Sequence, residues 1–422
     1  MKKRVESAPK LNLTKSMAML EEAQRLTPGG VGGIRRPYNF VIGEYPVFIE
    51  RGEGGHIIDV DGNEYIDMLC AYGPIILGYV EPEINEAVKK RMDLGFCFSL
   101  VQPVQNELEE RLAQILPCGE QTIIVKTGSD ATNAAVRAMR AYTGRDVIAR
   151  CGYHGWGDWC VENHGGVPQA VVELTKEFEY GDVADLERVF AENPGKVGGV
   201  ILTPVGHPTA KAVVPPPDGY LQAVIDLCHK NDTPICFDEI RTGFRVAMGG
   251  AQQRYGATPD LTTVGKAMAN GYPIAAVVGK ADILGVYVKD AFLSSTFFSN
   301  SLEMVAAMKC MDILEREKVQ DVIWERGTRF LDRLGKIVAA SGVPVTMSGI
   351  PPMPFLTFDH ADDHYRERRT EFYTQCIRRG LFVQPYHHWY IAYRHTGEDL
   401  TRALDVVEES LAYVAQEYPY SA

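Results

Sequence analysis

The chain has 422 residues, of which 45% are hydrophobic and 23% are charged, and its formal net charge is -12 at pH 7. This composition is typical of a globular protein and excludes a largely disordered chain, and the length allows two or three domains with a large core. The acidic balance argues against a nucleic-acid surface, which needs clustered Lys and Arg, and favours small-molecule partners.

The cysteine pattern and the start of the chain bear on localisation. Nine cysteines are scattered singly without a C-x-x-C pair, which predicts a reducing compartment, no disulfide framework and no metal site. The opening MKKRVESAPKLNLTKSM lacks the apolar stretch of a secretory signal, and no run approaches the ~18 apolar residues of a membrane helix. We therefore expect a cytoplasmic protein that does not enter a membrane.

The first seventy residues predict a β-rich appendage. Residues 14–27 have a helical pattern and lead into TPGGVGGIRRP, a Gly and Pro cluster that predicts a loop. Short alternating runs follow in YPVFIERGEGGHIIDVDGNEYIDML, punctuated by glycine turns, which predict an antiparallel meander. We expect residues 1–70 to form part of a small domain.

From about residue 82, helical patterns alternate with the short apolar runs TIIVKTG, DVIARCG, VGGVILTPV, PICFDEI and YPIAAVVGK. Such alternation predicts an α/β domain with a mainly parallel central sheet between helices, which we place at residues 71–308. Beyond residue 301 a long helical pattern leads into further strand signals. We expect residues 309–422 to form a smaller α+β domain together with the other chain end.

The run at 234–237 leads directly into Asp238 and Glu239, in the segment PICFDEIRTGFR. Ligands of such sheets bind at the carboxyl ends of strands, so an acid here is a candidate site residue. One interpretation is a solvated loop in which the acids pair with Arg241 or Arg245. A second is a magnesium-binding Walker B carboxylate, but this requires the phosphate loop G-x-x-x-x-G-K-[ST], which the sequence lacks.

The third interpretation pairs Asp238 with Lys266. Lys266 follows an apolar run among small residues, and a crowded, desolvated lysine loses its proton easily, which suits Schiff-base formation with a carbonyl cofactor. The two residues are 28 positions apart, about one strand-helix-strand unit, which would bring both to one edge of the sheet. A pyridoxal phosphate (PLP) enzyme needs this pair, because the lysine holds the aldehyde and the carboxylate keeps the pyridine nitrogen protonated.

The cofactor phosphate needs an anion site. In TIIVKTGSDATNAAVRAMRAYTG a strand meets a tight turn and an Ala-rich helix, so the N-H groups of Gly128 and Ser129 would point at the phosphate. The alternative is a plain helix cap formed by Ser129 or Asp130.

Aromatic and apolar side chains would cover the cofactor ring. The segment CGYHGWGDW follows the next apolar run and offers Tyr153, His154 and Trp156 for one face. A buried aromatic cluster in a loop core is the alternative. Ile240 points to the same side as Asp238 and would cover the other face.

These segments resemble the class III aminotransferases of fold type I, with glutamate-1-semialdehyde aminomutase and its relatives the most similar members. The resemblance covers LTPGGVGG, YGPIILGYVEPEINEAV, TGSDATNAAVRAMR, GYHGW, FDEIRTGFR, PDLTTVGKAMANGYPIAAVVG and STFFSNSLEM, in this order. It implies PLP as cofactor, Lys266 as the Schiff-base lysine, Asp238 as the partner of the pyridine nitrogen and Tyr153 as the stacked ring. It also implies a homodimer with shared active sites, in which Thr296 reaches the phosphate of the neighbouring subunit.

The resemblance suggests substrate residues as well. Arg36 aligns with a carboxylate-binding arginine, although the adjacent Arg35 would take that place if the register shifts by one. Arg394 is a second candidate for a carboxylate clamp, with a surface ion pair as the alternative for either arginine. Tyr72 is counted with the substrate side chains.

Three features depart from the family pattern. Thr203 stands where a glutamate is usual, and Lys126 stands where an asparagine is usual. The segment from Tyr153 to residue 180 is shorter than the gating loop of the aminomutase, and a short lid retains an intermediate less well.

The sequence therefore predicts a PLP-dependent aminotransferase that moves an amino group between an amine or amino acid and a keto or aldehyde acceptor. The alternative is an aminomutase, or an epimerase or racemase with Cys160, His154 or Tyr72 as the second acid-base group. A regulator that binds the cofactor without catalysis is a further alternative. The substrate stays open among amino acids, ω-amines and amino sugars.

Overall fold

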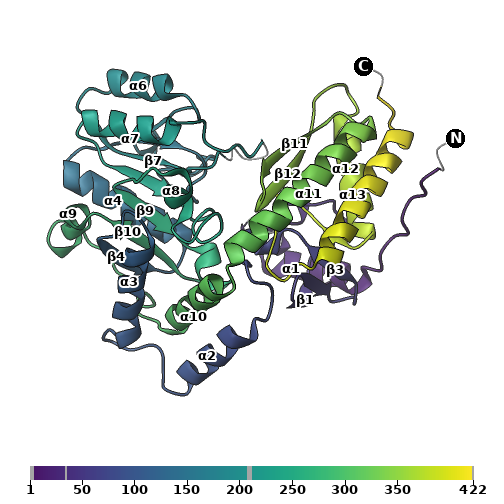
Figure 1. Cartoon of the computed structure of the whole chain (residues 1–422), viewed down its shortest axis with the longest axis horizontal. Helices are drawn as coiled ribbons and strands as arrows, with labels where there is room; N and C mark the ends of the chain where they lie inside the picture. Colours follow the sequence, from purple (N-terminus) through teal and green to yellow (C-terminus); the bar gives the residue numbers. More distant parts are fainter. Residues whose placement is uncertain (1–3, 34–35, 207–211, 421–422) are drawn as a thin grey trace. The chain divides into compact units, whose positions relative to one another are not determined.

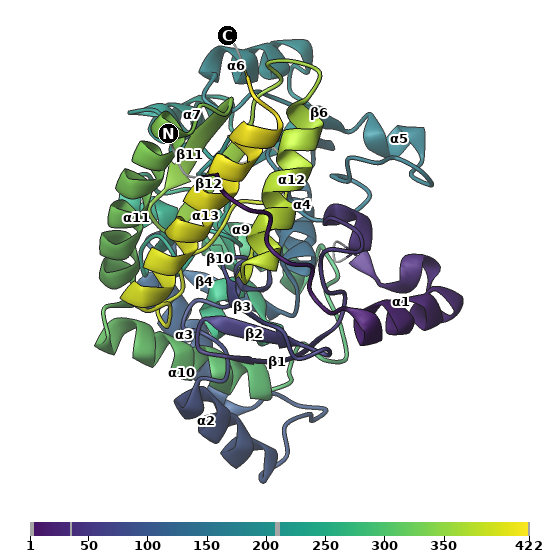
Figure 2. The same ribbon diagram turned by 90° about the vertical axis from the view of Figure 1, so that its right-hand side faces the viewer.

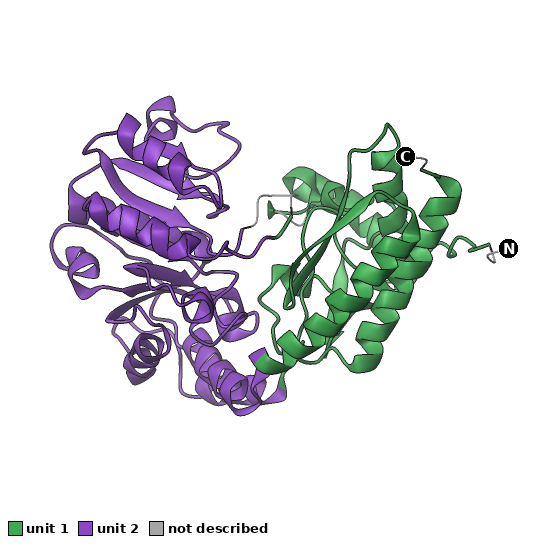
Figure 3. Ribbon diagram, turned by 45° about the horizontal axis from the view of Figure 1, so that its top comes forward, with its two compact units in different colours: residues 1–81, 209–213, 321–422 green, residues 82–208, 214–320 purple. Residues whose placement is uncertain are grey.

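The computed structural model describes residues 4–33, 36–206 and 212–420. The chain forms two compact units, shown in Figure 3. Unit 1 comprises residues 1–81, 209–213 and 321–422, and unit 2 comprises residues 82–208 and 214–320. A unit built from both chain ends agrees with the predicted fold class. The predicted domain limits, 1–70, 71–308 and 309–422, stay a prediction.

Unit 2 contains a 7-stranded sheet in the order β4-β10-β9-β8-β7-β5-β6. β10 pairs antiparallel with both of its neighbours, whereas the pairs from β9 to β6 are parallel, which confirms a mainly parallel sheet. The strand bounds are β4 (Gln121–Val125), β5 (Val147–Cys151), β6 (Thr175–Glu177), β7 (Val197–Leu202), β8 (Ile235–Asp238), β9 (Leu261–Val264) and β10 (Ala275–Gly279).

The central strands are buried on both faces because helices cover the sheet. Every residue of β5, β7, β8, β9 and β10 is buried, which explains their continuous apolar sequences. Helices α4 and α7 lie against the sheet, and α2 packs on α10 (Figure 1). The helices of unit 2 are α2 (Pro82–Met92), α3 (Pro103–Ile115), α4 (Gly128–Thr143), α5 (Gln169–Val172), α6 (Val183–Glu192), α7 (Tyr220–Lys230), α8 (Gly250–Tyr255), α9 (Ala281–Leu284) and α10 (Leu302–Arg316), with 3-10 turns η5 (Lys266–Ala269) and η6 (Gly285–Val288).

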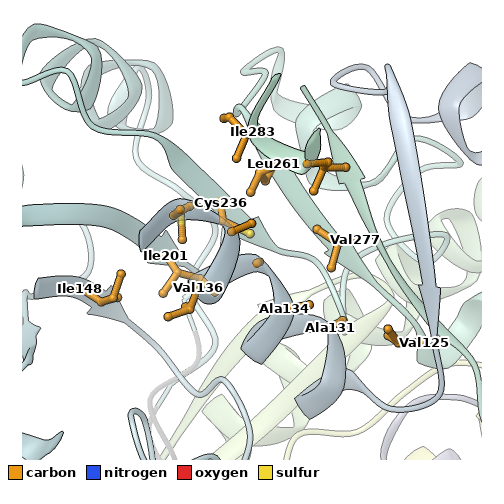
Figure 4. Packing of buried hydrophobic residues seen from close by; sticks show 14 of the residues in the cluster. Val125, Ala131, Ala134, Val136, Ile148, Ile201, Cys236, Leu261, Val277 and Ile283 are labelled. Atoms are coloured by element: carbon orange, nitrogen blue, oxygen red, sulfur yellow. The ribbon is translucent and has the colours of Figure 1, made fainter. Parts of the chain in front are cut away.

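Helix α4 lies close to the sheet because small residues form its packed face. Ala131, Ala134 and Val136 are buried in one cluster with Val125 and Val277 of the neighbouring strands (Figure 4). Alanine side chains allow the helix backbone to approach the strands closely. This packing fixes the first turn of α4 at the carboxyl end of β4, where the candidate phosphate site begins.

Unit 1 contains a 4-stranded sheet in the order β1-β2-β3-β13, together with the hairpin of β11 and β12. The first three strands form the predicted antiparallel meander, and β13 joins β3 in parallel. Helices α12 and α13 pack side by side (Figure 2). The bounds are β1 (Ile49–Glu53), β2 (His56–Asp59), β3 (Glu64–Asp67), β11 (Val345–Ile350), β12 (Met353–Phe358), β13 (Leu381–Phe382), α1 (Thr14–Leu26), α12 (Tyr365–Arg378) and α13 (Gly397–Glu417), with 3-10 turns η1 (Pro28–Gly30), η3 (Pro37–Asn39) and η4 (Cys70–Tyr72).

Helix α11 (Val319–Ser341) begins at the boundary and belongs to unit 1 from residue 321 onward. Among the described residues, no helix combines the length and the apolar character that a membrane crossing requires.

Candidate active site

Asp238 is the last residue of β8 and is buried. Its Oδ2 atom lies 2.7 Å from Nδ1 of His154, a side chain that is itself fully buried. Its Oδ1 atom accepts hydrogen bonds from the Thr263 hydroxyl and the Ile240 amide, both at 3.2 Å. These contacts hold the carboxylate in one orientation at the carboxyl end of the strand.

The adjacent acid, Glu239, has a different role. Its carboxylate is fully buried and accepts hydrogen bonds from the Thr242 hydroxyl at 2.8 Å, from the Ala251 amide, and from the amide and side chain of Gln252 at 3.2 Å each. Gly250 is left-handed, with φ of 70°, and an added Cβ would lie 2.2 Å from a Glu239 oxygen. Glu239 therefore anchors the turn after β8 to the start of α8.

Lys266 follows β9, three residues beyond Thr263, which is opposite Asp238 in the paired strands. Burial, and after it the nearby Arg241 charge, lower the pKa of the Lys266 ammonium, while Asp238 acts in the opposite direction, and the net pKa is about 8. The side chain makes no hydrogen bond or ion pair with any residue in the described ranges. Lys266 has a left-handed backbone with φ of 43°, which is a strained conformation for this residue type.

Ile240 connects the two ends of the candidate site. An added Cβ at Gly128 would lie 3.0 Å from its Cγ2 atom, and one at Gly265 would lie 3.3 Å from its Cδ1 atom. Ile240 thus packs between the first turn of α4 and the residue before Lys266. The fold thus brings Gly128, Ile240 and Gly265 together.

The first turn of α4 leaves two amides available to a ligand. Thr127 is the N-cap and forms a reciprocal capping box with Asp130, which accepts from the Thr127 amide at 2.9 Å. The cap is therefore not provided by Ser129. The N-H groups of Gly128 and Ser129 have no acceptor in the part of the chain that the structure describes, and they lie at the positive end of a 16-residue helix.

The loop after β5 lies against this turn. Gly152 and Gly155 are both left-handed, with φ of 106° and 107°, and an added Cβ at Gly155 would lie 2.3 Å from the Ser129 hydroxyl oxygen. The His154 carbonyl accepts a hydrogen bond from Thr132 of α4 at 2.8 Å. Tyr153, which lies between Gly152 and Gly155 in this loop, is half exposed, so much of its side-chain surface is open.

Three neighbours of this cluster were not among the predicted site residues. The Thr263 hydroxyl donates a hydrogen bond to Asp238. Thr263 lies opposite Asp238 in the neighbouring strand β9, and this pairing is set by the fold. Arg241 acts on Lys266 and donates to the Val205 carbonyl at 2.9 Å. Thr203, flagged only as a departure, is buried with its hydroxyl facing Gly152, where an added Cβ would approach to 2.3 Å.

The second departure, Lys126, ends next to the Thr296 loop. Its Nζ atom donates to the Asn300 carbonyl at 3.1 Å and pairs with Glu303 at 3.3 Å. Thr296 itself is exposed. Lys126 precedes the Thr127 cap, so these contacts connect the start of α4 to the base of the Thr296 loop.

The three predicted substrate residues belong to unit 1, whereas the cluster around Asp238 and Lys266 belongs to unit 2. Arg36 is exposed and donates to the Tyr38 hydroxyl. Arg394 is half exposed and pairs at 2.9 Å with the buried carboxylate of Glu81. Arg35 lies outside the described residues.

Tyr72 lies in a strained turn at the wall of a cavity. Cys70, Ala71 and Tyr72 are consecutive left-handed residues, with φ of 48°, 53° and 69°. The Asp67 carboxylate holds this turn by accepting from the Leu69 amide at 2.8 Å and the Cys70 amide at 3.1 Å. The cavity has a volume of about 300 Å³ and a mostly apolar lining, which includes Phe40, Val41, Ile57, Tyr72, Tyr79 and Phe382.

The family model for class-III aminotransferases matches residues 41–396, and the chain belongs to this family. It is 53% identical over 409 residues to the 3-aminobutyryl-CoA aminotransferase of Cloacimonas acidaminovorans, covering 96% of this chain and 99% of that protein. It is 32% identical to the glutamate-1-semialdehyde 2,1-aminomutase of Natranaerobius thermophilus, covering 95% and 99%. The chain is thus more similar to this aminotransferase than to the aminomutase, contrary to the order expected from the sequence.

Solved structures give the same class. The PLP internal aldimine form of FumI from Sphingopyxis sp. MTA144 matches with a TM-score of 0.91 and 27% identity, covering 97% of this chain and 98% of that one. An omega-transaminase from Sphaerobacter thermophilus matches with a TM-score of 0.88 and 25% identity, covering 94% and 97%. The protein is a PLP-dependent aminotransferase of this fold.

The residues of unit 2 fit the cofactor. Two free amides face a phosphate position at the start of α4, a buried carboxylate is held at the end of β8, and an amine without a protein partner follows β9. Glycine at 128 and 155 keeps this region open, because a Cβ at either position would meet Ile240 or Ser129. When bound, PLP withdraws electrons from the carbon that carries the amino group and so acidifies its proton.

Proposed function

We propose that this aminotransferase acts on a 3-amino acyl thioester of coenzyme A, exchanging its amino group with the carbonyl group of a 2-oxo acid. The observation that carries the proposal is the 53% identity, over nearly the full length of both chains, to an enzyme named for such a substrate. In the thioester, an uncharged carbonyl replaces the carboxylate of the free 3-amino acid, and the other end of the acyl chain is apolar. The substrate therefore needs an apolar pocket for its acyl chain and no arginine clamp for a carboxylate.

Two features of unit 1 support this substrate class. Arg394, one of the candidate clamps, already pairs with the buried Glu81, so its guanidinium balances a charge of the protein. Removing that pairing would leave a buried carboxylate uncompensated, which is costly. The cavity beside Tyr72 is mostly apolar and suits a short acyl chain.

The site residues have distinct roles in this proposal. Lys266 holds the cofactor through its side-chain amine and then moves the proton of the reacting carbon. Burial and the Arg241 charge favour the neutral amine that this needs, because they lower its pKa to about 8. Asp238, held by His154 and Thr263, keeps the proton on the ring nitrogen. Gly128 and Ser129 bind the phosphate, while Tyr153 and Ile240 cover the two ring faces.

A homodimer is part of the proposal. The loop at 93–102 is joined to the loop at 295–301 by hydrogen bonds from Gln102 to the Ser299 carbonyl at 2.9 Å and from the Ser301 amide to the Phe96 carbonyl at 3.0 Å. These joined loops expose large apolar side chains, namely Leu94, Phe98, Leu100, Val101 and Phe297. Such a patch suits an interface with a second copy, in which Thr296 would reach the phosphate of the partner. The unpaired cysteines suit a cytoplasmic enzyme.

The test of the substrate class is a comparison of amino donors. Purified holoenzyme is mixed with 3-aminobutyryl-CoA, free 3-aminobutyrate or glutamate 1-semialdehyde, and loss of the aldehyde absorption of the cofactor is followed. The proposal expects the thioester to react with a kcat/KM at least roughly 100-fold above that of the free acid. Equal rates for thioester and free acid would contradict it.

The aminomutase alternative is favoured by the 32% identity to such an enzyme. An aminomutase converts glutamate 1-semialdehyde without any added amino acceptor, whereas an aminotransferase stops after one half-reaction unless a 2-oxo acid is present. Multiple turnovers of the semialdehyde without an acceptor would establish the alternative.

A further inference from the structure

We propose that a cationic and aromatic surface of unit 1 binds the 3′-phosphorylated adenosine diphosphate end of the CoA thioester. This surface, the α12 cluster, consists of Tyr365, Arg366 and Arg369 at the start of α12 and Tyr386 beyond β13. The inference rests on the proposed substrate class, and it adds a second binding site away from the reacting carbon.

The two arginines of the cluster contact tyrosines. Arg369 donates to the Tyr386 hydroxyl at 2.9 Å, and its Cζ atom lies 4.6 Å from the centroid of that ring and 5.8 Å from the ring of Tyr365. Arg366 donates to the Tyr365 hydroxyl at 3.0 Å, with its Cζ atom 5.6 Å from the ring centroid. Two guanidinium groups and two tyrosine rings thus share one surface.

These arginines differ in their charge balance from the other arginines of α12 and its C-cap. Arg368, Arg378 and Arg379 form ion pairs with Asp362, Glu44 and Glu409. Within the described ranges, neither Arg366 nor Arg369 has a carboxylate within the 4.0 Å of an ion pair. Glu367 acts on Arg366 electrostatically without forming an ion pair. The N-H donors of both guanidinium groups are therefore not committed to a carboxylate and can bind an anion, even though the chain as a whole is acidic.

The combination of groups fits a nucleotide better than a simple anion. Guanidinium groups bind phosphate oxygens through paired N-H donors, and their flat faces stack on rings. Tyrosine rings and arginine planes likewise stack on bases. A simple carboxylate would pair with the two arginines but would have no group that stacks on Tyr365 or Tyr386.

The cluster is also continuous with the predicted substrate residue. Tyr386 precedes His387, whose ring packs edge-on against Tyr72 at a centroid distance of 5.1 Å. Tyr72 lines the apolar cavity of unit 1. A CoA thioester separates its acyl group from its nucleotide by a long flexible arm, so one molecule could place its acyl group beside Tyr72 and its phosphates on Arg366 and Arg369.

The first experiment compares full and truncated thioesters. The 3-aminobutyryl group is supplied on CoA, on 3′-dephospho-CoA and on N-acetylcysteamine, and kcat and KM are measured for the holoenzyme and for Arg366→Ala, Arg369→Ala and Arg369→Lys. We expect each alanine variant to lower the ratio of kcat/KM for CoA over N-acetylcysteamine roughly tenfold, through KM, because a charged hydrogen bond to phosphate is lost. Arg369→Lys keeps the charge and retains part of the ratio.

A matched control is Arg329→Ala, which removes an exposed arginine of α11 that pairs with Glu325. This variant should keep the wild-type ratio. An unchanged ratio in both Arg366→Ala and Arg369→Ala, or a wild-type enzyme that uses CoA and N-acetylcysteamine thioesters equally well, would overturn the nucleotide site and leave the thioester substrate intact.

The second experiment is independent of turnover. Calorimetric titration of the holoenzyme with adenosine 3′,5′-bisphosphate should show binding that weakens with salt and drops roughly tenfold or more in Arg369→Ala. If this binding is seen but no thioester reacts, the substrate class fails and the nucleotide site stands. Absence of binding to the wild-type protein would overturn the site.

Discussion

The Nδ1 atom of His154 lies 2.7 Å from the Asp238 carboxylate, and both side chains are buried. His154 lies in the loop after β5 and Asp238 is the last residue of β8, and the sheet brings them together. A charge-assisted hydrogen bond of this kind fixes the orientation of the carboxylate. The pair gives Asp238 the fixed position that a partner of the cofactor ring nitrogen requires.

Replacing Asp238 with Asn should lower kcat by about 100-fold or more, because a neutral amide no longer stabilises the positive charge on the ring nitrogen. The variant should still bind PLP, which absorbance titration would show. His154→Phe should give a smaller loss, since it removes the support of the carboxylate and not the carboxylate itself. A larger loss for His154→Phe than for Asp238→Asn would reverse these roles.

Lys266→Ala should reduce turnover by roughly 10,000-fold or more, because the variant lacks both the covalent attachment and the proton-moving amine. The protein should remain folded, as circular dichroism and thermal unfolding would verify. A high concentration of methylamine should restore a fraction of the rate by supplying an amine. Undiminished turnover in the variant would remove Lys266 from the site.

The pH dependence of cofactor uptake should report the lowered pKa of Lys266. Only the neutral amine attacks an aldehyde, and a pKa of about 8 makes half of the amine neutral at that pH, against under about 1% for an ordinary lysine. The rate at which apoenzyme takes up PLP should therefore rise with pH to a midpoint near 8. Arg241→Gln should move the midpoint upward, because it removes a nearby positive charge that favours loss of the proton.

The same pKa has a consequence for apoenzyme stability. Between pH 8 and the ordinary lysine range, the unfolded chain holds a proton at this side chain that the folded chain has released. The contribution of Lys266 to the free energy of unfolding therefore becomes more favourable as pH rises through that window. Comparison of Lys266→Met with the wild-type apoenzyme by denaturant titration at pH 7 and pH 9.5 should show that the advantage of Met shrinks at the higher pH.

Glu239→Ala should destabilise the protein by roughly 3 kcal/mol, since the buried donors of Thr242, Ala251 and Gln252 lose their acceptor. Urea unfolding measures this effect. Glu239→Gln keeps one acceptor oxygen and should cost less. Loss of activity without loss of stability would assign Glu239 to the chemistry.

The proposed homodimer predicts that disruption of the apolar loops separates the subunits. Leu100→Asp places a charge in the exposed patch of unit 2, and light scattering after size exclusion should then give half the wild-type mass. A matched control is Met19→Asp, which adds the same charge at another exposed apolar position. A wild-type protein that elutes as a monomer would contradict the dimer directly.

Much of unit 2 was predictable because its signals are local. Continuous apolar runs separated by helical patterns define buried parallel strands, and polar residues after such runs mark the strand ends where ligands bind. Asp238, Lys266, Gly128 and His154 were predicted as site residues in this way. The resemblance to class III aminotransferases suggested a role for each residue, and the family itself was confirmed by the comparisons.

The partners of these residues were not local. Asp238 and Glu239 are adjacent, and alternation along a strand predicts only that they point to opposite sides. Pairing of β8 with β9 and the position of the loop after β5 then decided that Asp238 meets Thr263 and His154. Glu239 accepts hydrogen bonds from amides at the start of α8, and these contacts, which the sequence does not show, assign it a structural role.

By itself the sequence determined the order of strands and helices and the chemistry carried at each strand end, because burial patterns and turn residues act over a few positions. Only the tertiary structure decided which charges are already balanced, as in the pair of Arg394 with Glu81, and which are not, as in Arg366 and Arg369. Electrostatic balance depends on distances between residues that are far apart in the chain, and the fold alone sets those distances.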